Sequence, residues 1–213
     1  MADGFEQMVD AALPFFTKLA ANNSKAWFEP HKEHYNEDIK KPAEFLADLL
    51  AEDLARVTGK AHAPKLFRIY RDVRFSKDKT PLNPRLHLKW SSSDKDALAP
   101  TWFCGLSPNY FIVGMGVMGL QGESLTRYRA FVDSWGDTLT DAMDEVAANG
   151  GTQSDWGGEP LKRVPKPYDQ DHAHGDLLKR KSLAMTIPMP EDWRAQGVVK
   201  AINGRVKDLK PVW

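Results

Sequence analysis

The spacing of apolar residues changes near residue 60, and this change limits the folds open to the chain. Before it, apolar residues recur at helical spacing in residues 5–21 and again from Pro42 until Gly59 ends the segment. After it come short segments rich in aromatic and β-branched residues, separated by loops of Pro, Ser, Asp and Asn. These segments predict strands near 67–75, 86–91, 101–106 and 109–118.

The C-terminal half returns to helical spacing. We expect helices at 123–134, 137–148, 175–181 and 196–208, with one more strand at 183–187. Helices from both ends of the chain around a central group of strands are typical of an α+β fold with a mostly antiparallel sheet. At 213 residues the chain is expected to form a single domain, 1–213. Its expected parts are helical residues 1–59, a strand-rich core at 66–118, and helices with mixed segments at 123–213.

Residues 68–81 contain an unusual density of charge among aromatic and β-branched residues. The five cations are Arg68, Arg71, Arg74, Lys77 and Lys79, and the two carboxylates are Asp72 and Asp78. In a strand over 67–75, Arg71 shares one face with four apolar side chains, namely Phe67, Ile69, Val73 and Phe75. An arginine in a buried row must be paired or hold a ligand, so we expect Arg71 to be buried and bonded to a carboxylate or backbone carbonyls.

This stretch is also the candidate site. Arginine binds carboxylate or phosphate oxygens through two parallel hydrogen bonds, and lysine adds a point charge. The expected ligand-binding residues are therefore the five cations, with Asp72 and Asp78 as candidate catalytic bases or as groups that orient an arginine. The alternative is an ion-pair network with a structural role. Because five cations face two acids locally, both interpretations stay open.

Two other patterns suggest a cofactor or a metal, and each has a plainer explanation. Residues Gly114, Gly116 and Gly119 match the dinucleotide-binding pattern, but no helix is expected to open at Gly119, so a strand that approaches another backbone closely is favoured. His172 and His174 lie in a polar loop without further ligands at metal-binding spacing, and solvated histidines are the expected state. The sequence therefore predicts no cofactor and no metal.

Charge is unevenly distributed along a chain whose formal net charge is zero. Residues 60–89 carry nine basic and two acidic side chains, net +7, and acidic segments flank them. The zero net charge and the acidic flanks argue against a nucleic-acid partner.

The single cysteine, Cys104, excludes an intrachain disulfide and is expected to be a small buried hydrophobic residue. An acidic N-terminus and the lack of a long apolar run lead us to expect a cytoplasmic protein without a membrane partner.

Several motifs together are similar to those of one protein family. They are Phe15-Phe16-x-x-Leu19 before Asn22-Asn23-x-x-x-Trp27-Phe28, the charged stretch at 68–81, Gly114 and Gly116, Arg127 and Arg129, and Pro165-Lys166-x-Tyr168-Asp169. The chain resembles the uncharacterised conserved family known as domain of unknown function 2461 from roughly Leu13 to its end. The family usually continues Thr-Pro with an aromatic residue and a lysine, whereas Leu82 and Asn83 follow Pro81 here. The resemblance implies where a site lies and implies no reaction.

Three functions follow from the sequence as hypotheses. The first is binding of a small anionic ligand, with or without catalysis, at the charged stretch. The second is nucleic-acid binding or nuclease chemistry, because a basic stripe near Tyr70, Phe75 and Trp90 is able to track a phosphate backbone. The third is a non-catalytic interaction module whose charged motif is structural. The sequence does not fix the oligomeric state.

Overall fold

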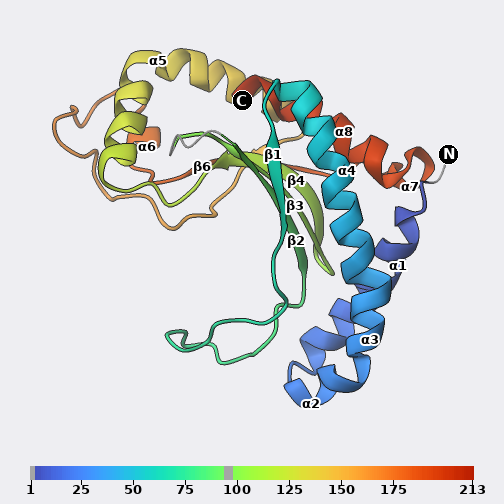
Figure 1. Ribbon diagram of the computed structural model, residues 1–213. Helices are drawn as coiled ribbons and strands as arrows, with labels where there is room; N and C mark the ends of the chain where they lie inside the picture. Colours follow the sequence, from blue (N-terminus) through green and yellow to red (C-terminus); the bar gives the residue numbers. More distant parts are fainter. Residues whose placement is uncertain (1–2, 94–97) are drawn as a thin grey trace.

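A six-stranded sheet, in the residues that the structure describes, forms the centre of the molecule (Figure 1). The structure is a computed structural model and describes residues 3–93 and 98–213. The strand order is β1-β2-β3-β4-β6-β5, and every neighbouring pair is antiparallel. The strands are β1 (His62–Leu66), β2 (Leu86–Ser92), β3 (Thr101–Ser107), β4 (Tyr110–Val117), β5 (Thr152–Gln153) and β6 (Leu183–Pro188).

Helices from both ends of the chain pack on one face of this sheet, which confirms the predicted α+β fold. The helices are α1 (Phe5–Ala21), α2 (Lys25–Phe28), α3 (Lys32–His34), α4 (Lys41–Thr58), α5 (Gly122–Ala148), α6 (Gly175–Leu178), α7 (Trp193–Gln196) and α8 (Val198–Leu209). Single turns of 3₁₀ helix at Glu29–His31 and Lys210–Val212 and a π-helical turn at Tyr35–Lys40 complete them. Helices α1, α4 and α8 contact the strands, and Figure 1 shows them on the same side. None of the helices in the described ranges is long and apolar enough to cross a membrane.

The two faces of the sheet differ because side chains alternate along each strand. On β2, Leu86, Leu88 and Trp90 are buried against the helices, whereas His87 and Lys89 point to the other face. The neighbouring strands continue this division, and the buried side includes Trp102, Cys104, Leu106, Val113, Met115, Met185 and Ile187. Among the described residues no helical layer covers the opposite face, which is called the open face below.

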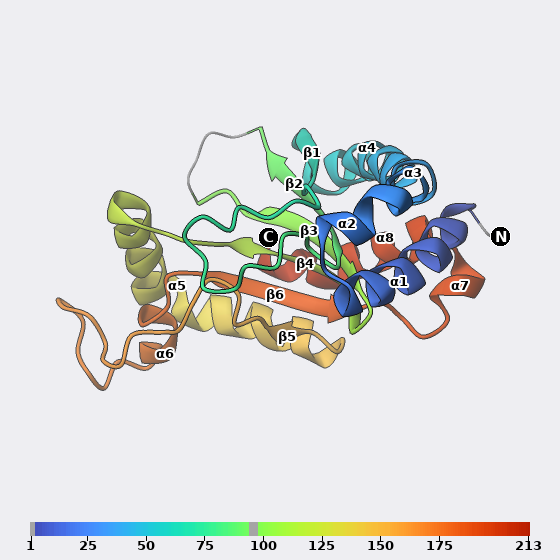
Figure 2. The ribbon, with the colours of Figure 1, turned by 90° about the horizontal axis from the view of Figure 1, so that it is seen from below.

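Helix α5 closes one end of the open face. The sequence predicts two helices here, at 123–134 and 137–148, and α5 does break between them at Trp135, whose backbone is not helical (φ −131°, ψ 22°). Next to the break, Gly136 faces the His174 ring so closely that a Cβ would lie 2.1 Å from it. Tyr128 and Val132 of the first half of α5 belong to a second, smaller core with α6. Figure 2 places this part of the molecule at the end remote from α1.

The predicted strand over 67–75 is wrong. β1 ends at Leu66, and the N–H of the next residue, Phe67, still donates to His87 O (2.9 Å). The remaining residues, 68–75, form a loop. The reason is that β2 starts at Leu86, so the ladder with β1 stops there, and Tyr70 pairs farther along with Leu82 in an isolated β-bridge. The supposed apolar row does not exist: Ile69 is buried, but Phe67 is 46% exposed and Phe75 is 95% exposed.

The glycine-rich segment is part of β4, as the sequence suggested. Gly114 and Gly116 lie inside this strand between β3 and β6, and the next helix starts at Gly122 and not at Gly119. A Cβ on Gly114 would lie 2.2 Å from the ring of Phe103, and one on Gly116 would lie 2.1 Å from Leu183 O. The glycines therefore permit close packing within an antiparallel sheet, and the parallel strand order of a dinucleotide fold does not occur here.

Candidate functional site

A concave cavity of about 610 Å³ lies on the open face of the sheet and is called the open-face pocket. Side chains of β2, β3 and β4 form its floor, and Phe67 and Trp156 come from the connecting segments. The lining residues are Phe67, Arg85, His87, Leu88, Lys89, Thr101, Phe103, Tyr110, Gly116, Met118, Trp156 and Gly157. Its size and its mixture of aromatic and polar groups are typical of a small-molecule site.

The pocket is positively charged. Arg85 and Lys89 line it, no carboxylate is among the lining residues, and neither cation forms a salt bridge within the described parts of the chain. In the β1–β2 ladder, Lys65 stands directly opposite Lys89, so both side chains leave the same face. Like charges placed directly opposite each other destabilise a sheet. An anion bound between such groups would relieve this repulsion.

His87 and Tyr110 form a hydrogen-bonded pair on the pocket floor. His87 Nε2 and Tyr110 Oη lie 2.8 Å apart, and the position of the shared proton depends on the imidazole tautomer. Burial, together with the nearby charge of Arg85, lowers the pKa of His87 to about 4. His87 is therefore a neutral hydrogen-bonding group at pH 7, and the net positive charge of the pocket comes from Arg85 and Lys89.

Aromatic rings form the apolar wall of the pocket. The ring of Trp156 lies 5.1 Å from that of Phe103 and 5.6 Å from that of His87, measured between centroids. Glycines make room for these rings, since Phe103 covers Gly114 and a Cβ on Gly105 would lie 3.1 Å from both His87 Nε2 and Tyr110. The floor thus pairs an aromatic surface with two cations at its rim.

The lowered pKa of His87 predicts an acid-sensitive stability. A histidine has a pKa near 6.5 in the unfolded chain, whereas His87 in the folded protein has a pKa of about 4. Between these two pH values the unfolded state is protonated at His87 and the folded state is not, and protonation stabilises the unfolded state. The free energy of unfolding should therefore fall by about 3 kcal/mol between pH 7 and pH 4 because of this group. Urea unfolding of the wild type and His87→Gln at a series of pH values checks this. The difference in free energy of unfolding between the two proteins should change by that amount, and parallel pH profiles would contradict it.

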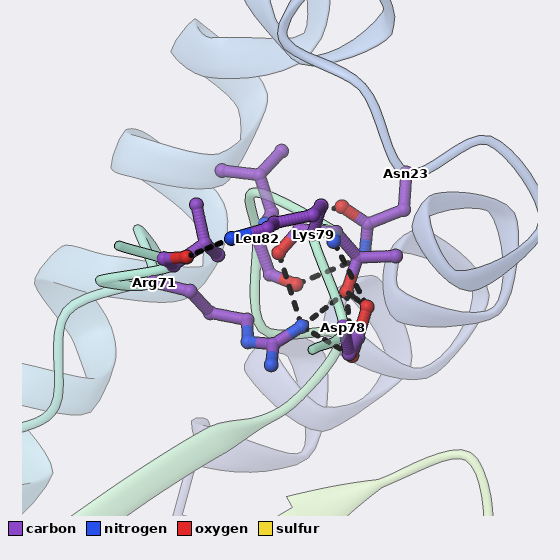
Figure 3. Close-up of polar contacts among 7 residues, drawn as sticks. Asn23, Arg71, Asp78, Lys79 and Leu82 are labelled. Carbon is purple, nitrogen blue, oxygen red and sulfur yellow. Dashed lines mark hydrogen bonds and ion pairs between the residues drawn. The ribbon is translucent and has the colours of Figure 1, made fainter. Parts of the chain in front are cut away.

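The predicted site residues lie in the loop between β1 and β2, and only some of them come together. Arg71 Nη1 donates to Asp78 Oδ2 (2.5 Å), to Thr80 O (3.0 Å) and to the Thr80 hydroxyl (Figure 3). The Arg71 side chain is 24% exposed, so the expected pairing with a carboxylate is confirmed while deep burial is not. The Thr80 N–H and hydroxyl and the Arg71 guanidinium lower the pKa of Asp78 to about 2.

The other four cations and Asp72 face elsewhere. Arg74 Nη2 donates to Asp72 Oδ2 (2.7 Å), and this exposed pair holds the pKa of Asp72 below its usual range. Lys79 Nζ donates to Val73 O (3.0 Å) within the loop. Arg68 and Lys77 are exposed, and neither lines a cavity described here. The structure therefore does not gather the five cations in one pocket.

The base of the loop is firmly attached to the N-terminal helices. Asn23 donates from Nδ2 to Leu82 O (2.9 Å) and accepts from Leu82 N–H at Oδ1 (3.1 Å). Arg71 N–H donates to Pro81 O (2.9 Å), and Tyr70 and Leu82 form an isolated β-bridge. A second cavity of about 320 Å³ lies at this base. Its lining residues are Ala20, Asn23, Arg71, Asp78, Thr80, Leu82, Asn83, Pro84 and Arg85.

Sequence reasoning missed the residues of the open-face pocket. Arg85, His87 and Lys89 belong to or adjoin a strand that the sequence predicts at 86–91. Its alternation of Leu86, Leu88 and Trp90 with polar residues was a usable signal for a polar face. No such local signal marks Tyr110 or Trp156, because only the folded sheet brings them to His87.

The remaining sequence candidates have structural partners. His172 Nε2 lies 3.0 Å from Asp133 Oδ1 and His174 Nε2 lies 2.9 Å from Asp137 Oδ1, so both rings tie their loop to α5. The described residues contain no cluster of three or more His, Cys, Asp and Glu side chains that could hold a metal ion. Cys104 is buried, and burial raises the pKa of its thiol to about 12, which excludes a ready nucleophile.

Comparison with known proteins identifies the family and no activity. A search of curated proteins returned no match. The family described as "Conserved hypothetical protein (DUF2461)" matches residues 11–213, which is nearly the whole chain. This chain belongs to the DUF2461 family.

Proposed function

We propose that the protein binds a small anionic ligand, bearing a phosphate or carboxylate group, in the open-face pocket. The observation that carries this proposal is the presence of Arg85 and Lys89, without carboxylate partners in the described residues, at a cavity of about 610 Å³ with no acidic lining residue. Lys89 is half-buried in this concave site, where a cation binds an anion more strongly than on a flat surface, and Arg85 stands exposed at its rim.

Each part of the pocket has a role in this proposal. Arg85 offers a planar guanidinium for two parallel hydrogen bonds to a phosphate or carboxylate, and Lys89 adds a point charge. Neutral His87 and Tyr110 offer further polar contacts without adding charge. Phe67, Phe103 and Trp156 cover an apolar portion of the ligand. This moves the proposed anion site from the loop at 68–81 to the adjoining face of the sheet.

Titration with inorganic phosphate, followed by NMR, tests the proposal. Shifts should be confined to the Arg85 and Lys89 side chains, the His87 ring and the Trp156 indole. The binding should not require Lys77, which is equally basic but exposed in the loop, so Lys77→Met serves as the matched control for Lys89→Met. Shifts spread evenly over all basic residues, or equal weakening by the two variants, would count against the proposed function.

A further inference from the structure

Arg85 connects the open-face pocket to the second cavity. It lines both the cavity of about 610 Å³ and the cavity of about 320 Å³ at the base of the loop. The second cavity is also lined by Arg71, so two arginines line it. Arg85 therefore lies at the border between the two cavities.

Arg71 is held so that part of its guanidinium is free. Its hydrogen bonds to Asp78 and Thr80 all leave from Nη1, as the dashed lines in Figure 3 show. Within the described ranges, Nε and Nη2 form no hydrogen bond or ion pair. A guanidinium fixed at one nitrogen keeps N–H groups for a further anion and loses little freedom on binding.

The carboxylate in this cavity, Asp78, cancels one of the two positive charges and leaves the other. Asp78 Oδ1 accepts from Thr80 N–H (2.9 Å) and from the Thr80 hydroxyl (2.8 Å), and Oδ2 accepts from Arg71. Asp78 thus neutralises Arg71 and orients it, while Arg85 contributes a net positive charge to the cavity. The two hydrogen bonds between the Asn23 side chain and the Leu82 backbone hold this arrangement against the N-terminal helices.

We propose that Arg71 and Arg85 form a second anion subsite beside the open-face pocket, so that the ligand carries two anionic groups. This inference rests on the proposed function, because the first anionic group occupies the open-face pocket. Two linked groups gain affinity because the second binds at a high effective concentration once the first is in place.

Binding of orthophosphate and tripolyphosphate, measured by calorimetry, separates the two proposals. The wild type should bind tripolyphosphate more tightly than orthophosphate. Arg71→Gln should weaken tripolyphosphate binding roughly tenfold or more, since the loss of hydrogen bonds to a charged group lowers the affinity by at least that factor. The same variant should leave orthophosphate binding in the open-face pocket unchanged. Arg71→Lys keeps the positive charge but loses the planar guanidinium with its paired N–H donors, so its loss of tripolyphosphate affinity should be intermediate.

Arg74→Gln is the matched control, because Arg74 belongs to the same loop and pairs with Asp72 outside the cavity. Equal tripolyphosphate affinities for Arg71→Gln and the wild type, or equal losses for Arg71→Gln and Arg74→Gln, would overturn the second subsite while leaving orthophosphate binding intact. Absence of orthophosphate binding to the wild type would overturn the proposed function itself, and the subsite with it.

Discussion

Replacement of Gly116 by alanine should destabilise the protein by about 3–5 kcal/mol, because overpacking and backbone strain act together at this position. The added Cβ would lie 2.1 Å from Leu183 O and 2.5 Å from Ala184 Cα, and backbone atoms in a paired strand cannot move aside. The glycine also has a φ of +156°, which an L residue rarely adopts. Urea unfolding followed by circular dichroism measures the change.

Gly204→Ala is the matched control for this substitution. Gly204 lies inside α8 with no atom within 4 Å of the position of a Cβ. Removing a glycine from a helix interior should raise the free energy of unfolding by about 0.5–1 kcal/mol. If Gly116→Ala were no less stable than Gly204→Ala, the tight packing of β4 against β6 would be contradicted.

Reversal of the charge at Lys89 should abolish anion binding. Lys89→Glu changes the pocket from two uncompensated cations to none, and it places a carboxylate where the anion would bind. We expect a loss of roughly hundredfold or more in phosphate affinity, since removing one charge-assisted contact costs about 1.5–3 kcal/mol and the new repulsion adds to it. Calorimetric titration at low ionic strength measures the loss.

Lys77→Glu is the control for Lys89→Glu, because it makes the same change in net charge on the exposed loop. It should reduce affinity only slightly, and less still as salt is added, since exposed charges at a distance are screened. A comparable loss from both variants would show that the anion responds to overall charge and not to the pocket.

The fold was predictable because its main signals are local. Apolar residues at helical spacing in 5–21 and 42–58, and Gly59 as a left-handed cap, produce α1 and α4 close to the expected bounds. The strands β2, β3, β4 and β6 likewise match the predicted segments within a few residues. The spacing of apolar residues indicates which side of a helix or strand is buried, and burial of that side against a neighbouring layer stabilises the helix or strand.

The segment after β1 shows where local signals fail. Its aromatic and β-branched residues fit a strand, but a strand needs a partner, and the partner β2 begins only at Leu86. Asp72 and Asp78 instead bond the backbone N–H groups two residues ahead, at Arg74 (3.2 Å) and Thr80 (2.9 Å). Such side-chain contacts compete with strand pairing and stabilise turns.

The open-face pocket was not predictable from spacing alone. Trp156 is distant in sequence from His87, and Tyr110 reaches it only through the β2–β3–β4 ladder. The cations of the charged loop lie two or three residues apart in the sequence, yet Arg74 and Lys79 form their hydrogen bonds within the loop. Among the seven site candidates of the stretch 68–81, Arg71 and Asp78 line a cavity described here.

We expect an anion to occupy the open-face pocket at Arg85 and Lys89. Crystals soaked briefly in dilute tungstate, a phosphate-like anion with a strong anomalous signal, test it directly. The highest anomalous peak should lie within hydrogen-bonding distance of Arg85 and Lys89. An empty open-face pocket in crystals whose exposed arginines, such as Arg74, hold tungstate would contradict the claim.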